Sequence, residues 1–297
     1  MYELIQLTDH DYYIDCPAKI GIVRIGAQEV IAIDSGSDKD AGRKVLRVLE
    51  QQGWQLSAIY NTHSHADHIG GNQFLQNRTG CRIYAPGLEA AFTNAPILEP
   101  MGLYGGYPFR ELHHKFLCAQ ESRAEPLTPE ALPQGMELLS LPGHSFDMVG
   151  FRTPDGTAYL ADCVSSAETL EKYGIGYLWD VGASLATLEQ LPALSAERFV
   201  PSHAPVCTDI APLAQKNRDA IARTADEILR FCALPRSFEE ILQQLFTVYG
   251  LTMTVQQYVL IGSTLRSYLA WLLDAGRVRY AFADSRMLWE TVPAAEQ

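Results

Sequence analysis

The sequence predicts an α+β fold in two parts, a strand-and-helix part over residues 1–213 and a smaller helical part over residues 214–297. Short apolar runs alternate with helical patterns as far as residue 213. Turn sequences rich in Gly, Pro and Asp separate these runs. From about residue 215 onward the apolar periodicity is mainly helical, which indicates a change of architecture at that point.

The first part opens with three expected strands and two expected helices. Apolar runs predict strands at 30–33, 57–60 and 82–85, and the first of these ends in the turn at 34–36. A helix is expected near 38–52, because its apolar residues share one face and Gly53 follows its end. A second helix should contain Phe74 and Leu75 and end at Gly80.

Four more strands are expected later in this part, at 137–141, 149–152, 157–161 and 198–203. The turn at 154–156 should join the middle two as a hairpin. Residues 94–134 break the pattern, with Pro and Gly interleaved among aromatic residues. We expect this insertion to form a lid or pocket wall. The alternative is a surface excursion that packs on its own body or on a second subunit.

The C-terminal part should contain three helices and a small hairpin. The first helix ends at Pro235, and Ser237 with Glu240 forms a capping box for the second. A longer helix is expected over 255–273, followed by short strands at 278–280 and 287–289. These elements would make a compact second domain.

Charge is unevenly distributed along the chain. The net charge is −12, but residues 215–297 carry nine Lys or Arg and nine Asp or Glu. The acidic excess therefore lies in residues 1–214, with 14 basic against 26 acidic residues. An acidic body repels phosphate backbones, so tight nucleic-acid binding is not expected, although a local basic patch is compatible with this charge.

The composition is that of a soluble globular protein, with 47% hydrophobic residues. The N-terminal residues 1–6 lack the features of a secretory signal, and no apolar run approaches the roughly 20 residues that span a bilayer. Six cysteines are scattered singly without a CxxC pair, which favours reduced thiols. We therefore expect a cytoplasmic location and no membrane partner.

The segment 62–68, Thr-His-Ser-His-Ala-Asp-His, carries the strongest functional signal. Neutral imidazole is the commonest metal ligand in proteins, and carboxylate oxygen completes sites for divalent ions. His63 and His65 would share one side of an extended segment, while Asp67 and His68 follow where it turns. Two ligand pairs in one stretch indicate two metals. A solvated His-rich tract is disfavoured, because such tracts are repetitive and this one follows a strand.

Other polar residues with ligand chemistry also occur at strand ends. Each lies at or just beyond the end of an expected apolar strand, which would gather distant residues along one rim of a sheet. Core packing alone would not place such residues there. The five are Asp34, His63, His144, Asp162 and His203.

Over roughly residues 10–210 the sequence resembles the metallo-β-lactamase superfamily. Five blocks carry the resemblance in the family's order: Asp34, the run from His63 to His68 followed by Gly70-Gly71, the segment 142–145 (Pro-Gly-His-Ser), Asp162 and His203. The resemblance implies a four-layer αββα sandwich, in which two sheets are flanked by helices and two metals lie at one edge.

The same resemblance implies the ligands. His63, His65 and His144 would hold one ion, Asp67, His68 and His203 the other, and Asp162 would bridge them. Asp67 and Asp162 would also be catalytic. Nitrogen and oxygen donors with an open position are typical of a catalytic site. Two divalent metal ions are expected. Zinc is the expected metal, with iron or manganese as alternatives. Asp34 would contact one of the metal ligands without binding metal itself and so orient that ligand. Alternatively, it would cap the next helix.

These features predict a dinuclear metal-dependent hydrolase of a small ester, thioester or lactone, in which a metal-bridging hydroxide attacks. The metal motif is similar to that of glyoxalase II, but Cys163-Val164-Ser165-Ser166 departs from that family's pattern after the bridging aspartate. Glutathione-thioester specificity is therefore not implied. Two alternatives remain open: a mononuclear iron enzyme of the persulfide dioxygenase type, and a phosphodiesterase or ribonuclease.

The C-terminal part resembles a winged helix of the kind attached to some hydrolases of this superfamily, including an endoribonuclease. Because it is neutral, we expect it to pack on the core, close the pocket or form a homodimer rather than bind nucleic acid. Five residues are candidates for binding a small-molecule substrate or donating a proton, with a surface position as the alternative for each: Tyr104, Tyr107, His113, His114 and Tyr173.

Overall fold

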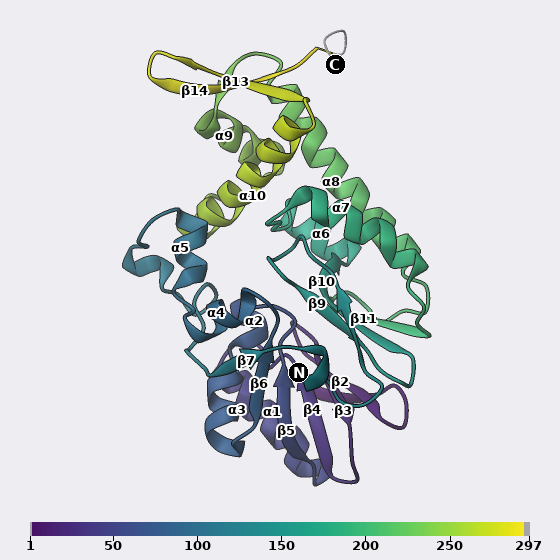
Figure 1. Ribbon diagram of the computed structural model, residues 1–297. Coiled ribbons are helices and arrows are strands. Elements are labelled where there is room, and N and C mark those ends of the chain that lie inside the picture. Colours follow the sequence, from purple (N-terminus) through teal and green to yellow (C-terminus); the bar gives the residue numbers. More distant parts are fainter. Residues whose placement is uncertain (1, 294–297) are drawn as a thin grey trace.

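The computed structural model describes residues 2–293 and confirms the mixed α and β architecture. Two sheets face each other, and helices cover the outer face of each sheet (Figure 1). This is the expected order of helices, sheet, sheet and helices. The C-terminal helices extend beyond the sandwich on the side of the second sheet.

The first sheet has seven strands in chain order. Its first four strands are antiparallel neighbours, and the strands from β4 onward run parallel. Parallel strands end at the same edge, so the loops after β4 and β5 meet there. The strands are β1 (Glu3–Gln6), β2 (Asp11–Asp15), β3 (Ile20–Arg24), β4 (Glu29–Ile33), β5 (Gln55–Tyr60), β6 (Arg82–Ala85) and β7 (Ala124–Pro126).

Two helices that connect the parallel strands cover the outer face of this sheet. They are α1 (Lys39–Gln52) and α3 (Asn72–Thr79), and both end at a glycine in the left-handed conformation, as expected from Gly53 and Gly80. At the start of α1, the Asp38 side chain accepts a hydrogen bond from the Ala41 N–H. The apolar face of α1, with Val45 and Leu49, packs on the sheet because these side chains are buried there.

The second sheet has four strands in the order β11-β10-β9-β8. Here β10 runs parallel to β11 and antiparallel to β9, and the turn at 154–156 forms the expected hairpin. Helices α7 and α8 pack on β10. The elements are β8 (Glu137–Ser140), β9 (Val149–Arg152), β10 (Thr157–Ser165), α6 (Ala167–Tyr173), α7 (Val181–Gln190), β11 (Arg198–His203) and α8 (Ala211–Phe231).

An apolar core fills the space between the two sheets. Phe151 is fully buried there and lies edge-on to Tyr60. Tyr159 crosses between the sheets, and its hydroxyl donates a 2.8 Å hydrogen bond to the Tyr12 carbonyl. A buried hydroxyl needs such a partner, and this bond links the two sheets.

The insertion 94–134 is more structured than its composition suggested. It follows α4 (Glu89–Asn94), contains α5 (Leu98–Tyr104) and short 3₁₀ turns at 110–112 and 129–131, and includes β7. Because β7 pairs with β6, part of the insertion completes the first sheet. Its strand of three residues is too short for an apolar pattern to reveal.

The C-terminal part holds the three expected helices and hairpin. Helix α8 runs through residue 213, and the Ser237–Glu240 capping box is present. One apolar cluster continues from β10 through α7 and α8 to α10, so the division at residue 213 and the likeness to a winged helix remain predictions. The added elements are β12 (Arg236–Ser237), α9 (Phe238–Val248), α10 (Val255–Asp274), β13 (Val278–Ala283) and β14 (Arg286–Thr291).

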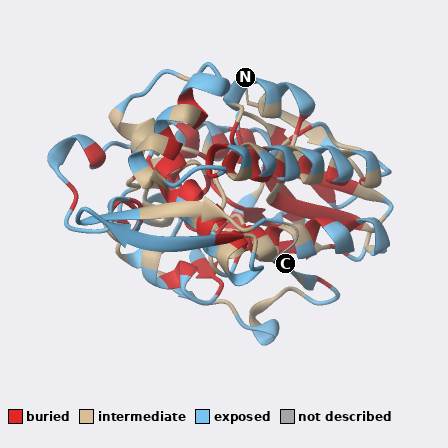
Figure 2. Ribbon diagram, turned by 90° about the horizontal axis from the view of Figure 1, so that it is seen from above, coloured by how far each residue is buried: buried red, intermediate tan, exposed pale blue. Residues whose placement is uncertain are grey.

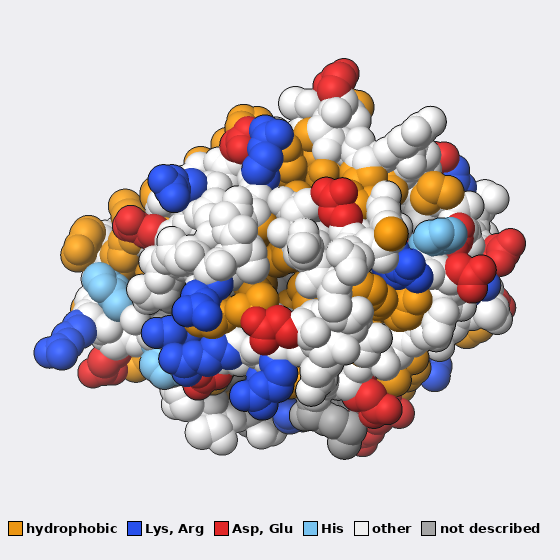
Figure 3. All heavy atoms as spheres, turned by 90° about the horizontal axis from the view of Figure 1, so that it is seen from below, with side chains coloured by type: hydrophobic (Ala, Val, Ile, Leu, Met, Phe, Trp, Pro, Cys, Tyr) orange, Lys and Arg blue, Asp and Glu red, His pale blue; other side chains and the backbone are white. Residues whose placement is uncertain are grey.

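The surface reflects these layers. The β13–β14 hairpin is largely exposed, whereas the strands of the sandwich are largely buried (Figure 2). At the end of the molecule opposite the C-terminal helices, Lys and Arg gather on one side of the face, and acidic side chains lie beside them and elsewhere on the face (Figure 3). A net charge of −12 thus coexists with a local basic area. All six cysteines are free thiols. Within residues 2–293, we find no helix long and apolar enough to cross a membrane.

Candidate metal centre

The histidine run begins where β5 ends and continues into a short helix, α2 (Ala66–Ile69). His63 and His65 face each other, with Nε2 of His63 3.0 Å from Nδ1 of His65. Asp67 and His68 lie in α2, so the chain turns between the two ligand pairs as the sequence predicted. The short helix thereby directs Asp67 and His68 toward a second position.

Gly70 and Gly71 hold this run against the loop that follows β4. A Cβ atom on Gly70 would lie 2.3 Å from the Ser37 carbonyl carbon and oxygen, and one on Gly71 would lie 2.3 Å from the Ser35 oxygen. Real side chains do not approach backbone so closely. These glycines therefore allow α2 to pack against the β4–α1 loop.

We expect Gly70→Ala to destabilise the protein by about 1–3 kcal/mol, because its methyl group must displace backbone. The shift should also weaken metal binding through Asp67 and His68. Urea unfolding and metal titration measure the two effects. Gly102→Ala is the matched control, since a Cβ there meets no atom within 4 Å; equal behaviour of the two variants would contradict this account of the packing.

Three further residues reach the same place from the second sheet. His144 lies in the loop after β8, and His203 is the last residue of β11. The sequence pattern placed Asp162 just beyond the end of a strand. In the structure it lies inside β10. The pairing of β10 with β11 is irregular after Ala161, whose backbone has a φ of 51°. This bulge explains the difference, because it redirects the strand and turns Asp162 toward the histidines.

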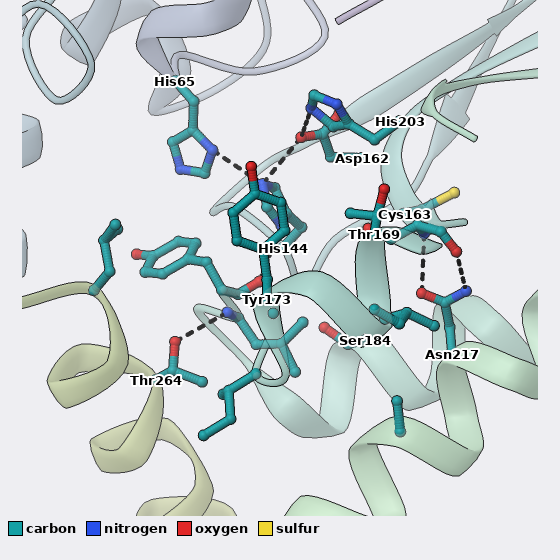
Figure 4. Close-up of a pocket in the computed structure, with 18 of the residues that line it drawn as sticks. His65, His144, Asp162, Cys163, Thr169, Tyr173, Ser184, His203, Asn217 and Thr264 are labelled. Atoms are coloured by element: carbon teal, nitrogen blue, oxygen red, sulfur yellow. Dashed lines mark hydrogen bonds and ion pairs between the residues drawn. The ribbon is translucent and has the colours of Figure 1, made fainter. Parts of the chain in front are cut away.

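The seven side chains form two groups in which the possible ligand atoms of each group lie within 4.8 Å of one another. Asp162 belongs to the second group but also approaches the first, with Oδ2 3.5 Å from His144 Nε2 and 3.2 Å from His203 Nε2 (Figure 4). Its carboxylate is therefore within reach of histidines from both groups. One group is His63, His65 and His144, and the other is Asp67, His68, Asp162 and His203.

The remaining nitrogen of four of these imidazoles is fixed by a hydrogen-bonding partner. His144 Nδ1 lies 3.0 Å from the Tyr177 carbonyl, and His203 Nδ1 lies 2.9 Å from the Pro17 carbonyl. His63 Nδ1 lies 2.9 Å from Thr62 Oγ1, and His68 Nδ1 contacts Asp34. Such contacts orient metal-ligating histidines and set which nitrogen is free for a metal.

Asp34 contacts both Thr62 and His68 and so connects two residues of the histidine run. Its carboxylate accepts hydrogen bonds from the Thr62 N–H and Oγ1, both at 2.8 Å, and lies 2.8 Å from His68 Nδ1. The side chain that caps α1 is Asp38 instead. Asp34 has a φ of 65°, a conformation that aspartate tolerates better than most residues. Its contacts thus favour the orienting role over the capping role.

Two buried glutamates near the site were not anticipated. Glu89 is fully buried and accepts hydrogen bonds from Ser64 N–H and Oγ and from Ser145 Oγ and Asp147 N–H. It thus ties the loop of the histidine run to the loop that carries His144. The second, Glu99, lies 3.6 Å from His65 Nε2.

Burial and neighbouring charges set the protonation of the site. Burial lowers the pKa of His65 to about 3 and the pKa of His63 well below its usual value, so both favour the neutral form that binds metal. In the second group, the Asp162 carboxylate raises the pKa of His203 to about 10. Burial raises the pKa of Glu99 to about 8, and the nearby Glu89 adds to this effect.

Two buried polar atoms at the centre lack a hydrogen bond. They are Nε2 of His68 and Oδ1 of Asp162, which lie 3.1 Å apart. Buried polar atoms without partners are rare in folded proteins, and a bound ion is one of the recognised reasons for them. Together with the nitrogen and oxygen donors, they fit divalent metal ions in this position.

The five candidate substrate-binding residues lie in different places. Tyr173 lines the cavity next to the metal centre. Tyr104, Tyr107, His113 and His114 do not line this cavity in the described structure, and Tyr107 is 76% exposed. From the same insertion, the residues that do line it are Glu99, Phe116 and Leu117. Tyr177, whose ring lies 5.3 Å from that of His65, lines it as well.

The fold and these two ligand groups together define a class of protein. A family model described as the metallo-beta-lactamase superfamily matches residues 14–203, and the chain belongs to this superfamily. The match spans the region from β2 to β11, which contains all seven candidate ligands.

Curated relatives with sequence similarity carry the name hydroxyacylglutathione hydrolase. The chain is 30% identical over 166 residues to one from Methylococcus capsulatus, covering 52% of this chain and 51% of that protein. It is 27% identical over 224 residues to one from Rhodopseudomonas palustris, covering 68% and 72%. The chain thus spans about half the length of the first of these relatives.

Solved structures share the fold over nearly the whole chain. A metallo-beta-lactamase family protein from Thermus thermophilus matches with a TM-score of 0.73 and 16% identity, covering 98% of both chains. A beta-lactamase domain protein from Burkholderia ambifaria matches with a TM-score of 0.74 and 15% identity, covering 98% of this chain and 94% of that one. The C-terminal elements are therefore included in these structural matches.

Proposed function

We propose that the protein is a hydrolase that uses two divalent metal ions to cleave a small ester, thioester or lactone. Zinc is the metal that we propose. The single observation that carries the proposal is Asp162, whose carboxylate lies within 3.5 Å of histidines from both ligand groups. The relatives' name, hydroxyacylglutathione hydrolase, supports hydrolysis of an acyl compound.

In this proposal, His63, His65 and His144 hold one ion, Asp67, His68 and His203 hold the other, and Asp162 is shared. When bound, two such ions lower the pKa of a shared water toward neutrality and polarise the bond to be cleaved. Asp34 positions His68 by accepting a hydrogen bond from its Nδ1–H group, and Thr62 connects Asp34 to His63. The centre needs no serine or cysteine nucleophile for this reaction.

Cys163 follows Asp162 in the sequence and lines the cavity next to the metal centre. Burial raises the pKa of the Cys163 thiol far above its usual value, so the thiol stays protonated and is a poor nucleophile.

An activity screen of the metal-loaded protein tests the proposal. We expect hydrolysis of simple esters, thioesters or lactones, loss of this activity on chelation and recovery when zinc is returned. Phosphodiesters and single-stranded RNA serve as comparison substrates. Oxygen consumption with a persulfide and about one iron per chain would instead establish the mononuclear dioxygenase, and activity on RNA alone would establish a nuclease.

A further inference from the structure

A cavity of about 380 Å³ opens from the metal centre and continues beneath the C-terminal helices. We call it the chamber. His65, Asp162 and His203 lie at one end, whereas Ser184 of α7, Asn217 of α8 and Thr264 of α10 surround the other (Figure 4). Its volume lies within the range of about 300–1,000 Å³ that is typical of small-molecule sites. Because the chamber and the metal centre are continuous, one molecule can occupy both.

The deep walls of the chamber are apolar and well buried. Leu188, Ile221, Ile261 and Tyr268 line it from three helices, and none of these side chains is more than 7% exposed. They belong to the apolar cluster that joins the second sheet to the C-terminal helices. The C-terminal part thus closes the chamber on the side away from the metals.

Polar side chains in these walls are already engaged within the protein. Asn217 exchanges hydrogen bonds with the Ser165 backbone, and Thr264 Oγ1 accepts one from the Leu178 N–H. Ser184 and Thr187 donate theirs to backbone carbonyls. A ligand in the deep chamber would therefore meet methyl and methylene groups rather than free donors and acceptors.

Away from the metal centre, the chamber also lacks a partner for a negatively charged ligand. Among the described residues that line it there is no Lys or Arg, and its acidic side chains are Asp67, Glu99 and Asp162. Burying an unpaired carboxylate or phosphate is strongly unfavourable. Charged groups such as those of glutathione or a phosphodiester would therefore have to lie outside the chamber.

We propose that the chamber binds the uncharged, apolar acyl chain of the substrate and so selects medium- to long-chain acyl esters or thioesters. This inference rests on the proposed hydrolase function, because it places the acyl carbonyl at the metal centre. The acyl chain is the part of such a molecule that is apolar throughout, and the enclosed walls match it. Each methylene that enters should strengthen binding about fourfold.

Binding of primary alkanols tests the chamber without using catalysis. We expect calorimetry on the full-chain, metal-loaded protein to show tighter binding from ethanol through hexanol to decanol, with a gain of more than a hundredfold across the series. Ala220, on the chamber wall in α8, provides the variant: Ala220→Phe should weaken decanol binding at least tenfold. Ala222→Phe, on the exposed side of the same helix, should leave it unchanged.

A second variant changes the part of the chamber wall that α10 forms. Leu260→Trp in α10 should have the same effect as Ala220→Phe, so the test survives if one variant fails to fold, which circular dichroism will reveal. Equal affinity for short and long alkanols would overturn the proposal. So would unchanged decanol binding in the folded Ala220→Phe and Leu260→Trp variants.

Ester hydrolysis separates this inference from the proposed function. We expect kcat/KM for p-nitrophenyl esters to rise from acetate to decanoate, Ala220→Phe to remove the rise, and Ala222→Phe, on the exposed side of the same helix, to keep it. Hydrolysis of all esters at the same rate would overturn the chamber assignment and keep the hydrolase. Chain-length-dependent alkanol binding without hydrolysis of any ester would support the chamber and overturn the hydrolase.

Discussion

Replacement of Asp162 by alanine should reduce hydrolysis by at least about a hundredfold, because even residues that only orient metal ligands contribute ten- to a hundredfold. Asp162 contacts His68, His144 and His203, so its loss removes a carboxylate that contacts histidines of both ligand groups. We expect the variant to stay folded. Steady-state kinetics of the zinc-loaded variant, with circular dichroism as the folding check, measures the effect.

The Asp162→Ala control is Asp226→Ala, which removes an exposed carboxylate from α8 and should keep full activity. His65→Ala should behave like Asp162→Ala, since it removes the imidazole that lies 3.0 Å from both His63 and His144. Full activity in Asp162→Ala would refute a mechanism that needs two metals.

Replacement of Glu89 by alanine should cost about 1–3 kcal/mol of stability, the penalty for leaving buried hydrogen-bond donors without an acceptor. Its carboxylate is fully buried and accepts four hydrogen bonds from two loops. Without it, the buried Ser64 N–H and Ser145 hydroxyl lose their acceptor. Urea denaturation of the two proteins measures the difference in the free energy of unfolding.

Glu89→Gln separates shape from charge, because it keeps one acceptor oxygen and should lose less stability than Glu89→Ala. Glu50→Ala on the exposed face of α1 is the control and should change stability little. We also expect weaker zinc binding in Glu89→Ala, since Ser64 stands between His63 and His65. A Glu89→Ala variant as stable as Glu50→Ala would mean that this carboxylate does not hold the two loops together.

The candidate ligands could be predicted from sequence because their chemistry and their position coincide. Imidazoles and carboxylates stand next to short apolar strands, and the packing of the two sheets brings His63 from the first sheet together with His144 and His203 from the second. The exact direction of Asp162 could not be predicted, because it depends on a bulge at Ala161, an ordinary alanine in sequence. The N-terminal hairpins were missed as well: β2 begins and ends with aspartate, and the first of these, Asp11, is buried although it is polar.

The outer parts of the site depend on packing that no local pattern reveals. Glu89 lies on a six-residue helix, and only the approach of two loops gives it four donors. Aromatic residues in the insertion suggested substrate contacts, yet Tyr107 faces solvent while Glu99 and Leu117 line the chamber. The chamber itself forms where α7, α8 and α10 meet, so its walls come from residues more than 80 positions apart, such as Ile175 and Ile261.

The most direct test of the two-metal centre is a measurement of metal content. The protein, freed of metal and then saturated with zinc, should bind two ions per chain, one for each ligand group. Elemental analysis after removal of loosely bound metal gives this number, and a folded Asp34→Asn variant should retain the ion of the second group less tightly. A stoichiometry of two supports the account. Saturation at one ion per chain would contradict it.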